Sequence, residues 1–206
     1  MDRGPKEKQE RALVERLNLK GERSLSPKSA TVRKPYKPGM HGPNGRRKQL
    51  SEFGLQLKEK QKFKISYGIN ERGLSGVFHR ASKAKGSSAV KLVEFLERRL
   101  DNTIYRLGMA PSRGSARQLI VQGHIVVNKS RVRSPGFVVK VGDIIKLHPG
   151  SETTGFFTKQ KELMKKFDPP AWLHLDPVKM EGRVLSPPEN SAVPFEANLV
   201  VESFSK

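Results

Sequence analysis

Apolar side chains recur every three or four residues in the middle of the chain. Residues 87–109, SSAVKLVEFLERRLDNTIYRLGM, show this repeat most regularly. Such spacing puts the apolar groups on one helix face, so the pattern predicts a single long helix here. Gly108 near its end is a candidate C-cap. The apolar stripe consists of Leu92, Leu96, Leu100, Ile104 and Leu107.

A shorter helix and several strands are predicted directly after the long helix. Pro111 prevents the long helix from continuing, and Ser112 is a candidate N-cap for a second helix that ends at Gly123. Short runs rich in β-branched residues then predict strands. We place these strands at 124–128, 131–132, 137–141 and 144–147, with a turn at Gly142–Asp143 between the last two.

The first third of the chain predicts helices and a polar arm. Ser51 is a candidate N-cap for a helix that extends to about residue 65. Three glycines between 68 and 76 predict short helices broken by turns. Residues 7–19 form a candidate short helix. The Pro- and Gly-rich stretch after it has too few apolar residues to fold alone, but it carries six Lys and Arg residues between positions 20 and 37. Because of this charge we expect an arm that becomes ordered on a polyanion, RNA. The alternative is a flexible tail.

Charge indicates the kind of partner. The 206 residues include 40 Lys and Arg against 20 Asp and Glu, a formal net charge of +20. Such an excess costs self-repulsion, which a polyanion would offset, and nucleic acid is the commonest polyanionic partner. The alternative is that the lysines only keep the protein solvated. Residues 1–64 and 65–167 have net charges of +11 and +12, whereas residues 168–206 have −3. We therefore expect the last quarter to have a structural role, as a segment that returns to pack against another part of the chain.

Missing residue types exclude several classes of function. The chain has no cysteine, so disulfides, thiolate catalysis and cysteine-based zinc sites are excluded. The five histidines lack ligand spacing, and we expect neither a metal nor a cofactor. No apolar run approaches the roughly 18–20 residues of a membrane span, and the N-terminus lacks the apolar region of a signal peptide. We expect a cytoplasmic protein with no membrane partner.

The order of the motifs resembles a known family. SARQLIVQGHIVVN at 115–128, followed by RV and SPGFVVKVGDII, is similar to the small RNA-binding module named after small-subunit ribosomal protein four. Motifs on both sides of it match that ribosomal protein family in its bacterial or organelle form, over about residues 35–206. They are KPGMHGP at 37–43, LSEFGLQLKEKQK at 50–62, YGINER at 67–72, RLDNTIYRLGMAPSRGSARQL at 99–119, WLHLDPVKMEG at 172–182 and LVVESFSK at 199–206.

The resemblance implies an α+β fold. A mostly helical domain would carry an inserted αα-plus-β RNA-binding module and a basic extended N-terminal arm. The implied boundaries are 1–45 for the arm, 46–96 and 162–206 for the discontinuous helical domain, and 97–161 for the module. The last quarter of the chain would then return to pack on the helices of residues 46–96.

The resemblance also implies partners. Family members bind the five-prime domain of small-subunit ribosomal RNA at a multi-helix junction, join early in assembly, and organise later proteins. They contact ribosomal protein five, at an interface linked to decoding accuracy, and lie near the path by which mRNA enters. Some repress translation of their own operon. No homo-oligomer is expected, and the protein would act on a cytoplasmic ribosome, with an organelle ribosome as the alternative.

Matching the motifs residue by residue implies a set of RNA-binding positions. Within the module they are Arg99, Asn102, Arg106, Arg113, Arg117, Gln118, His124, Asn128, Lys129 and Arg131. Outside it they are His41, Arg46, Arg47, Lys48, Lys58, Lys60, Lys62, Lys64, Tyr67 and Arg72. The lysines from 58 to 64 are spaced by two, so they would spread around a helix among several phosphates. For His124, a strand-start role without RNA contact is an equal alternative. We expect Arg117 to be a surface residue and Leu119 to be in the core.

The chain departs from the family pattern at three places. Many members carry a cysteine cluster for zinc near the N-terminus, which is missing here, so RNA and packing must order the arm. Lys129 replaces the usual glycine after the strand, so Asn128 must make the turn or the lysine is strained. Ser115 replaces an acidic residue, which loses a capping box but removes a negative charge near phosphate.

Two rival functions share the same module. RRLD at 98–101 resembles the RLD of pseudouridine synthases, which would make the protein an RNA-modifying enzyme. However, Asp101 is expected on the surface of a leucine-striped helix, and the 45 residues after position 161 are too few for that catalytic domain. The other rival is a heat-shock or recycling factor that binds ribosomal particles. Such a factor would lack PGMHGP and WLHLDPVKMEG, so we expect a ribosomal protein and not an enzyme.

Overall fold

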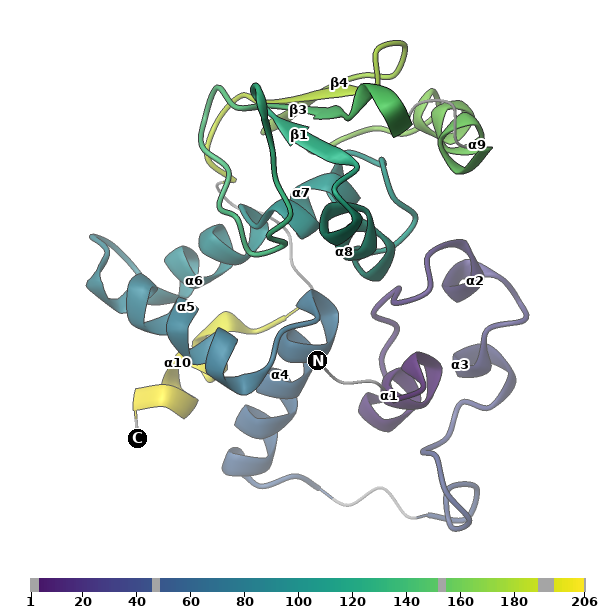
Figure 1. The fold of residues 1–206 in the computed structure, drawn as a ribbon. Helices are drawn as coiled ribbons and strands as arrows, with labels where there is room; N and C mark the ends of the chain where they lie inside the picture. Colours follow the sequence, from purple (N-terminus) through teal and green to yellow (C-terminus); the bar gives the residue numbers. More distant parts are fainter. Residues whose placement is uncertain (1–3, 46–48, 152–154, 189–194, 206) are drawn as a thin grey trace. The chain divides into compact units, whose positions relative to one another are not determined.

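The structure, a computed structural model, describes residues 4–45, 49–151, 155–188 and 195–205. The chain forms two compact units, Met1–Val93 with Ala192–Lys206, and Glu94–Ser191. Helices dominate the first unit, and the second combines helices with a five-stranded sheet (Figure 1). The predicted α+β class is therefore confirmed.

The helices of the first unit start and stop at residues with recognisable local chemistry. They are α1 (Lys6–Leu13), α2 (Glu22–Leu25), α3 (Ala30–Arg33), α4 (Glu52–Tyr67), α5 (Glu71–Lys83) and α10 (Ala197–Ser205). Ser51 caps α4 as predicted, because its side-chain oxygen accepts from the Gly54 N–H at 3.2 Å. Asn70 caps α5 in the same way through the Gly73 N–H at 2.8 Å. Gly68 ends α4 with a φ of 60°.

The prediction of short, broken helices after α4 is wrong. Residues 71–83 form the single helix α5, although Gly73 and Gly76 lie within it. A glycine costs a helix only about 1 kcal/mol relative to alanine. Burial of one apolar face, which includes Leu74, Val77 and Phe78, offsets that cost.

The N-terminal segment is folded, which corrects the expectation of an extended arm. Its helix α1 covers 6–13 rather than 7–19. The buried Glu10 carboxylate accepts from the backbone N–H groups of Leu17 and Leu19 at 3.2 and 3.0 Å. The Arg11 Nε donates to the carbonyls of Lys34 and Tyr36 at 2.9 and 3.1 Å. These links use polar side chains, so the pattern of apolar residues does not predict them.

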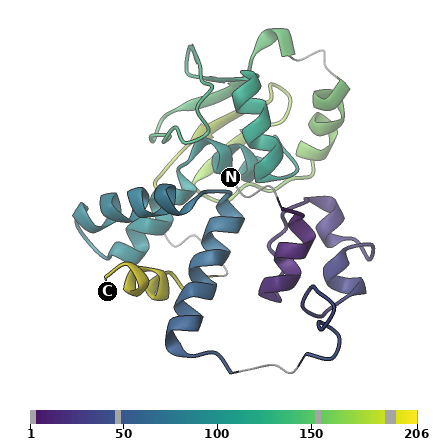
Figure 2. The same cartoon turned by 60° about the horizontal axis from the view of Figure 1, so that its bottom comes forward.

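The C-terminal helix α10 packs on α4 and α5. Figures 1 and 2 show it beside α4 from two directions. Phe204 stacks on Phe78 with ring centroids 4.9 Å apart, and Lys60 Nζ lies 3.9 Å from the Phe204 centroid. The ring of Phe195, just before α10, lies against the ring of Phe63, with centroids 5.0 Å apart. This part of the C-terminal segment returns to the helices of residues 46–96, as predicted.

The second unit has a five-stranded antiparallel sheet, and the helices of residues 100–106 and 113–122 lie against one of its faces (Figure 1). Its helices are α7 (Leu100–Arg106), α8 (Arg113–Gln122) and α9 (Gly155–Met164), with a 3-10 turn η1 (Pro149–Ser151), while α6 (Ser88–Glu97) leads into it from the first unit. The strands are β1 (Ile125–Val127), β2 (Ser130–Arg131), β3 (Ile144–Leu147), β4 (Leu173–Asp176) and β5 (Glu181–Val184), in the order β2-β1-β3-β5-β4.

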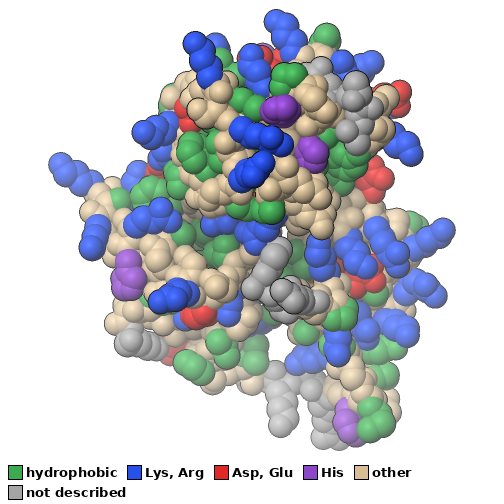
Figure 3. Space-filling model, viewed as in Figure 1, with side chains coloured by type: hydrophobic (Ala, Val, Ile, Leu, Met, Phe, Trp, Pro, Cys, Tyr) green, Lys and Arg blue, Asp and Glu red, His purple; other side chains and the backbone are tan. Residues whose placement is uncertain are grey.

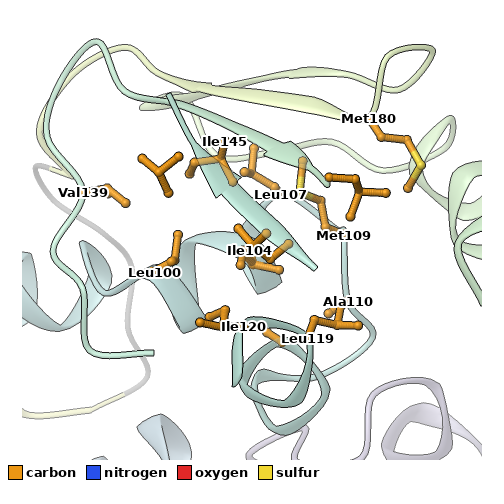
Figure 4. Close-up of a cluster of buried hydrophobic side chains, with 14 of the residues drawn as sticks. Leu100, Ile104, Leu107, Met109, Ala110, Leu119, Ile120, Val139, Ile145 and Met180 are labelled. Atoms are coloured by element: carbon orange, nitrogen blue, oxygen red, sulfur yellow. The ribbon is translucent and has the colours of Figure 1, made fainter. Parts of the chain in front are cut away.

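A single apolar core lies between the helices and the sheet of the second unit. Figure 4 shows side chains of α7 and α8 meeting those of the sheet, among them Ile104, Ile120 and Ile145. All three are fully buried. Leu119 also belongs to this core, as predicted. Gly123 ends α8 with a φ of 78°, as predicted, and turns the chain into β1.

The predicted long helix is in fact two helices. The chain leaves α6 at Glu97 and enters α7 at Leu100, and Arg99 between them has extended backbone angles, φ −68° and ψ 137°. The N–H of Leu100 donates to the Phe137 carbonyl at 2.8 Å, and the N–H of Val139 donates to the Arg98 carbonyl at 2.9 Å. Long-range backbone hydrogen bonds therefore replace helical ones, and no glycine or proline marks the break.

The same hydrogen bonds explain why the predicted strand at 137–141 is wrong. This segment makes one isolated bridge, Val138 with Arg99, and does not join the sheet. The turn at Gly142–Asp143 is present, because the Asp143 N–H donates to the Lys140 carbonyl at 3.1 Å. The sheet position next to β3 is taken by β5 instead.

The predicted domain boundary at residue 162 also needs correction. Strands β4 and β5 add to the sheet of the second unit, through pairs such as Ile145 with Gly182. The second unit therefore includes β4 and β5, and only the segment with α10 belongs to the first unit. The composition of residues 168–191 showed their low charge but not which part of the chain they pair with.

Candidate RNA-binding site

A buried carboxylate, Asp101, joins two of the predicted RNA-binding arginines. Arg99 donates to it twice, from Nε to Oδ1 at 3.1 Å and from Nη2 to Oδ2 at 2.8 Å. Arg117, on α8, donates from Nη2 to Oδ2 at 2.7 Å. The side chain of Asp101 is 3% exposed, and those of Arg99 and Arg117 are 13% and 17% exposed. The expectation that Asp101 and Arg117 are ordinary surface residues is therefore wrong.

A second buried carboxylate, Glu97, holds a third arginine. Arg106 donates from Nε to Oε2 at 2.9 Å and from Nη2 to Oε1 at 3.1 Å. The Glu97 side chain is fully buried. Asn102 connects this pair to the rest, since its Nδ2 donates to Glu97 Oε2 at 3.0 Å and its Oδ1 accepts from Arg113 Nε at 2.7 Å. The Arg113 guanidinium also lies 4.7 Å from the Tyr105 ring centroid.

We define the arginine cluster as Arg99, Arg106, Arg113 and Arg117 with Glu97, Asp101 and Asn102. It is one continuous hydrogen-bonded group, because the backbone N–H of Asn102 donates to Asp101 Oδ1 at 3.0 Å and so joins the two sets of contacts. It contains four guanidinium groups and two carboxylates, so its net charge is +2. Local sequence fixes the helix that carries two of its arginines: Ser112 caps α8 as predicted, through the Ser115 N–H at 3.2 Å. The cluster can present positive charge in a fixed geometry.

The hairpin after α8 contributes further predicted residues. Asn128 takes the left-handed turn conformation, with φ 56°. Of the two alternatives given for this turn, Asn128 therefore makes it, and Lys129 does not have to adopt a strained positive φ. Its side chain holds the turn, because Oδ1 accepts from the Ile144 N–H at 3.0 Å and Nδ2 donates to Asp143 Oδ1 at 3.1 Å. Arg131 donates from Nε to the Gly123 carbonyl at 2.6 Å. These side chains therefore shape the hairpin, and Lys129 projects from it exposed.

The side chain of His124 contacts two residues of the second unit. Its Nδ1 lies 2.8 Å from Ser151 Oγ, a hydrogen bond whose direction depends on the tautomer. Its ring meets the edge of Phe157 with centroids 5.8 Å apart. These contacts agree with the alternative of a strand-start residue, while RNA contact of His124 stays a prediction.

The predicted lysines of α4 are paired with acids of the same unit. Lys60 and Lys64 reach the two oxygens of Glu71 at 2.6 and 3.0 Å. Burial raises the pKa of Glu71, but the hydrogen bonds from these lysines outweigh it and place that pKa below its ordinary value. Lys58 lies 3.7 Å from Glu15, just after α1. The lysines therefore do not project uniformly around the helix.

Lys62 is the most enclosed of these lysines. It contacts the carboxylates of Glu59 and, at 2.5 Å, Glu15, and its side chain is 7% exposed. Burial lowers the pKa of Lys62, but the hydrogen bonds to Glu15 and Glu59 outweigh this and raise it above its ordinary value. Lys62 is therefore an internal charge that links α4 to the N-terminal segment, and the expectation that it reaches phosphate is corrected.

Two other predicted residues are also buried. Tyr67 lies against Phe63 with centroids 6.2 Å apart, and Asn102 lies inside the arginine cluster. Their burial argues against the RNA contact that was predicted for both. By contrast, His41, Arg72 and Gln118 are exposed. Arg46, Arg47 and Lys48 lie outside the described residues.

The face of the molecule drawn in Figure 3 carries many Lys and Arg side chains and few acidic ones. Other exposed basic residues were not predicted as RNA ligands; in the second unit they include Arg133, Lys140, Lys165, Lys166, Lys179 and Arg183. Within the described ranges, no group of histidine and acidic residues could hold a metal ion. In the same ranges no helix is long and apolar enough to cross a membrane.

Comparison with known proteins decides the family. The family model "Ribosomal protein S4/S9 N-terminal domain" matches residues 2–97, and "S4 domain" matches residues 98–145. A small ribosomal subunit protein uS4 from Acetivibrio thermocellus is 44% identical over 194 residues, which cover 93% of this chain and 92% of the relative. The chain belongs to the uS4 family of small ribosomal subunit proteins. The uS4 proteins of Caldicellulosiruptor bescii and Syntrophomonas wolfei are 44% and 42% identical, with the same coverage.

Membership of the uS4 family confirms the predicted class, a structural ribosomal protein and not an enzyme. The S4 domain match begins at Arg98 and therefore contains most of the arginine cluster. The two carboxylates of that cluster, Glu97 and Asp101, were missed as site residues. Their one signal in the sequence is position, since each lies within a few residues of an arginine in RRLDN. The burial of Glu97 and Asp101 could not be predicted, because the apolar pattern indicated one continuous helix across these positions.

Proposed function

We propose that this uS4 protein is a primary binder of small-subunit ribosomal RNA, at a multi-helix junction of the five-prime domain, and that it nucleates assembly. The observation that carries the proposal is the arginine cluster, which holds four guanidinium groups within one S4 domain. The net charge of +20 supports it, because binding a polyanion relieves the self-repulsion of the protein.

The chemistry of the cluster fits recognition of RNA backbone. A-form RNA hides its base edges in a deep, narrow groove, so a protein must read its phosphates and its shape. A guanidinium can donate two parallel hydrogen bonds to a phosphate, which fixes orientation as well as charge. We therefore propose the four arginines as the central RNA ligands. Gln118, Lys129 and Arg131 would extend the contact along the hairpin.

Residues of the first unit complete the proposed interface. Exposed His41 and Arg72 are proposed to contact RNA, as are Arg46, Arg47 and Lys48 on the basis of their sequence alone. Lys58, Lys60 and Lys64 would reach phosphate while they also bind the acids described above. Lys62, Tyr67 and Asn102 are left out because they are buried.

We further propose that the protein contacts ribosomal protein five and lies near the path by which mRNA enters, with an effect on decoding accuracy. The family resemblance over about residues 35–206 supports this proposal. The site of action would be a ribosome of the bacterial cytoplasm or of an organelle. Cross-linking within reconstituted small subunits would test it: links from this chain to ribosomal protein five are expected, and links to other proteins only would contradict it.

A footprint of the protein on small-subunit ribosomal RNA tests the primary proposal. We expect protection concentrated in the five-prime domain, around one junction, at protein concentrations that leave the other domains unprotected. Uniform weak protection over the whole RNA would contradict it. A uridine isomerisation assay on the same complexes addresses the enzyme rival, and no product is expected. Retention on purified small subunits in high salt separates a ribosomal constituent from a recycling factor.

A further inference from the structure

We infer that Asp101 and Glu97 are positioning residues for RNA binding, a role that rests on the proposed function. The two carboxylates act through the arginines they hold. Acidic residues in a site for a polyanion would ordinarily weaken binding by repulsion. Here both are buried inside the arginine cluster, and each is paired with a guanidinium through two hydrogen bonds.

The geometry explains how an acid can strengthen the binding of an anion. An arginine side chain has many rotamers, and ordering it on a ligand costs conformational entropy. Asp101 orders two arginines before RNA binds, so this entropy cost is not part of the binding step. Arg99, at the start of α7, and Arg117, in the middle of α8, both donate to Asp101 Oδ2. Glu97 does the same for Arg106. A ligand that binds a prearranged site loses less free energy in ordering it.

The polar atoms of the two acids face inward. Asp101 Oδ1 also accepts from the backbone N–H of Asn102 at 3.0 Å, so each of its oxygens has two donors. Glu97 Oε2 accepts from Asn102 Nδ2 as well as from Arg106. The two carboxylates are thus bound by donors of the arginine cluster, whose four guanidinium groups outnumber them by two.

Replacing Asp101 with asparagine separates positioning from simple charge. Asp101→Asn makes the protein more positive by one charge, so a purely electrostatic site would bind RNA as tightly or more tightly. A positioning role predicts the opposite: affinity for a five-prime-domain transcript should fall by about tenfold or more. The salt dependence should flatten by the equivalent of one or two phosphate contacts.

Glu181→Gln is the matched control, because it removes the same charge elsewhere. Glu181, on β5, pairs with Lys146 at 2.8 Å, and among the described residues it has no ion pair with an arginine of the cluster. We expect this variant to bind RNA as tightly as wild type or slightly more tightly. If Asp101→Asn and Glu181→Gln both retain full affinity and salt slope, the inference is overturned. If wild-type protein itself does not bind the transcript, the proposed function fails instead.

Two further variants guard against a simple loss of folding. Asp101→Glu keeps the charge but moves the carboxylate by one methylene, and circular dichroism and melting would show that it is folded at the assay temperature. We expect it to bind several-fold more weakly than wild type, and unchanged binding by it would overturn the inference whether or not Asp101→Asn folds. Arg117→Gln should weaken binding less in the Asp101→Glu background than in wild type, and additive effects would show that Asp101 does not act through Arg117.

Discussion

Arg117 and Asp101 are separated by sixteen positions, yet Nη2 of the arginine donates to Oδ2 of the aspartate at 2.7 Å. The aspartate is almost fully buried and the arginine is mostly so. The bond joins α8 to the first turn of α7. An arginine proposed as an RNA ligand is therefore also a part of the fold, and replacing it should affect both properties.

Arg117→Ala should lower the free energy of unfolding by about 1–3 kcal/mol, because the buried Asp101 carboxylate loses one of its charged donors while Arg99 remains. Denaturant melts measure this. Gln118→Ala, at the exposed neighbouring position, is the control and should change stability by no more than about 0.5 kcal/mol. Equal melts for the two variants would mean that the Arg117–Asp101 bond does not contribute to stability.

Leu119 and Val121 offer a core test on the same helix. Leu119 belongs to the apolar core of the second unit, whereas Val121 is 56% exposed. Leu119→Ala should therefore cost about 2–5 kcal/mol through lost burial and a cavity. Val121→Ala should cost about 0.5 kcal/mol or less. If both cost the same in thermal melts, the orientation of α8 against the sheet is not as described.

Gly182 tests the packing of the return strands on α7. A Cβ on Gly182 would overlap Cδ1 and Cδ2 of Leu107, which is fully buried in the apolar core. Gly182→Ala should therefore destabilise the protein by about 1–3 kcal/mol through overpacking. Gly155→Ala, at the start of α9 where a Cβ meets open space, should be close to neutral. A neutral Gly182→Ala would argue that β5 does not lie against α7.

Glu71 should make stability depend on acid pH. Its pKa is lower in the folded state than the ordinary 4.5, so it stabilises the fold at neutral pH. That stabilisation is lost as pH falls below the unfolded value and through the folded one. The gap in Tm between wild type and Glu71→Gln should thus be widest near pH 7 and shrink below about pH 4.5. Because Glu71 is half exposed, the gap should correspond to at most about 1 kcal/mol. A gap that is constant from pH 7 to pH 3 would be the contrary result.

Local chemistry made the helix ends and the turn predictable. Ser51 and Ser112 cap helices because a short polar side chain can reach a backbone N–H two or three residues on. Gly123 and Asn128 take positive φ, where other residues would be strained. Each of these features depends on a few neighbouring residues, so the sequence alone contained the signal.

Features that depend on distant partners could not be predicted in this way. The break at Arg99 exists because residues 135–139 supply its hydrogen bonds, and β5 takes the place beside β3 that residues 137–141 were expected to fill. The burial of Asp101 follows from the same break. Charge and family motifs indicated the arginines, but only the structure shows that Glu97 and Asp101 are buried and bind them.

The proposed binding of this uS4 protein to the phosphates of small-subunit ribosomal RNA should be measured with a five-prime-domain transcript over a range of salt concentrations. Filter binding over a range of salt concentrations should give an affinity that falls linearly on a log–log plot, by several decades between low and moderate salt, if on the order of 8–10 phosphates are contacted. An unrelated RNA of equal length should bind much more weakly at every salt concentration. A nearly flat salt curve, or equal affinity for the unrelated RNA, would contradict the account.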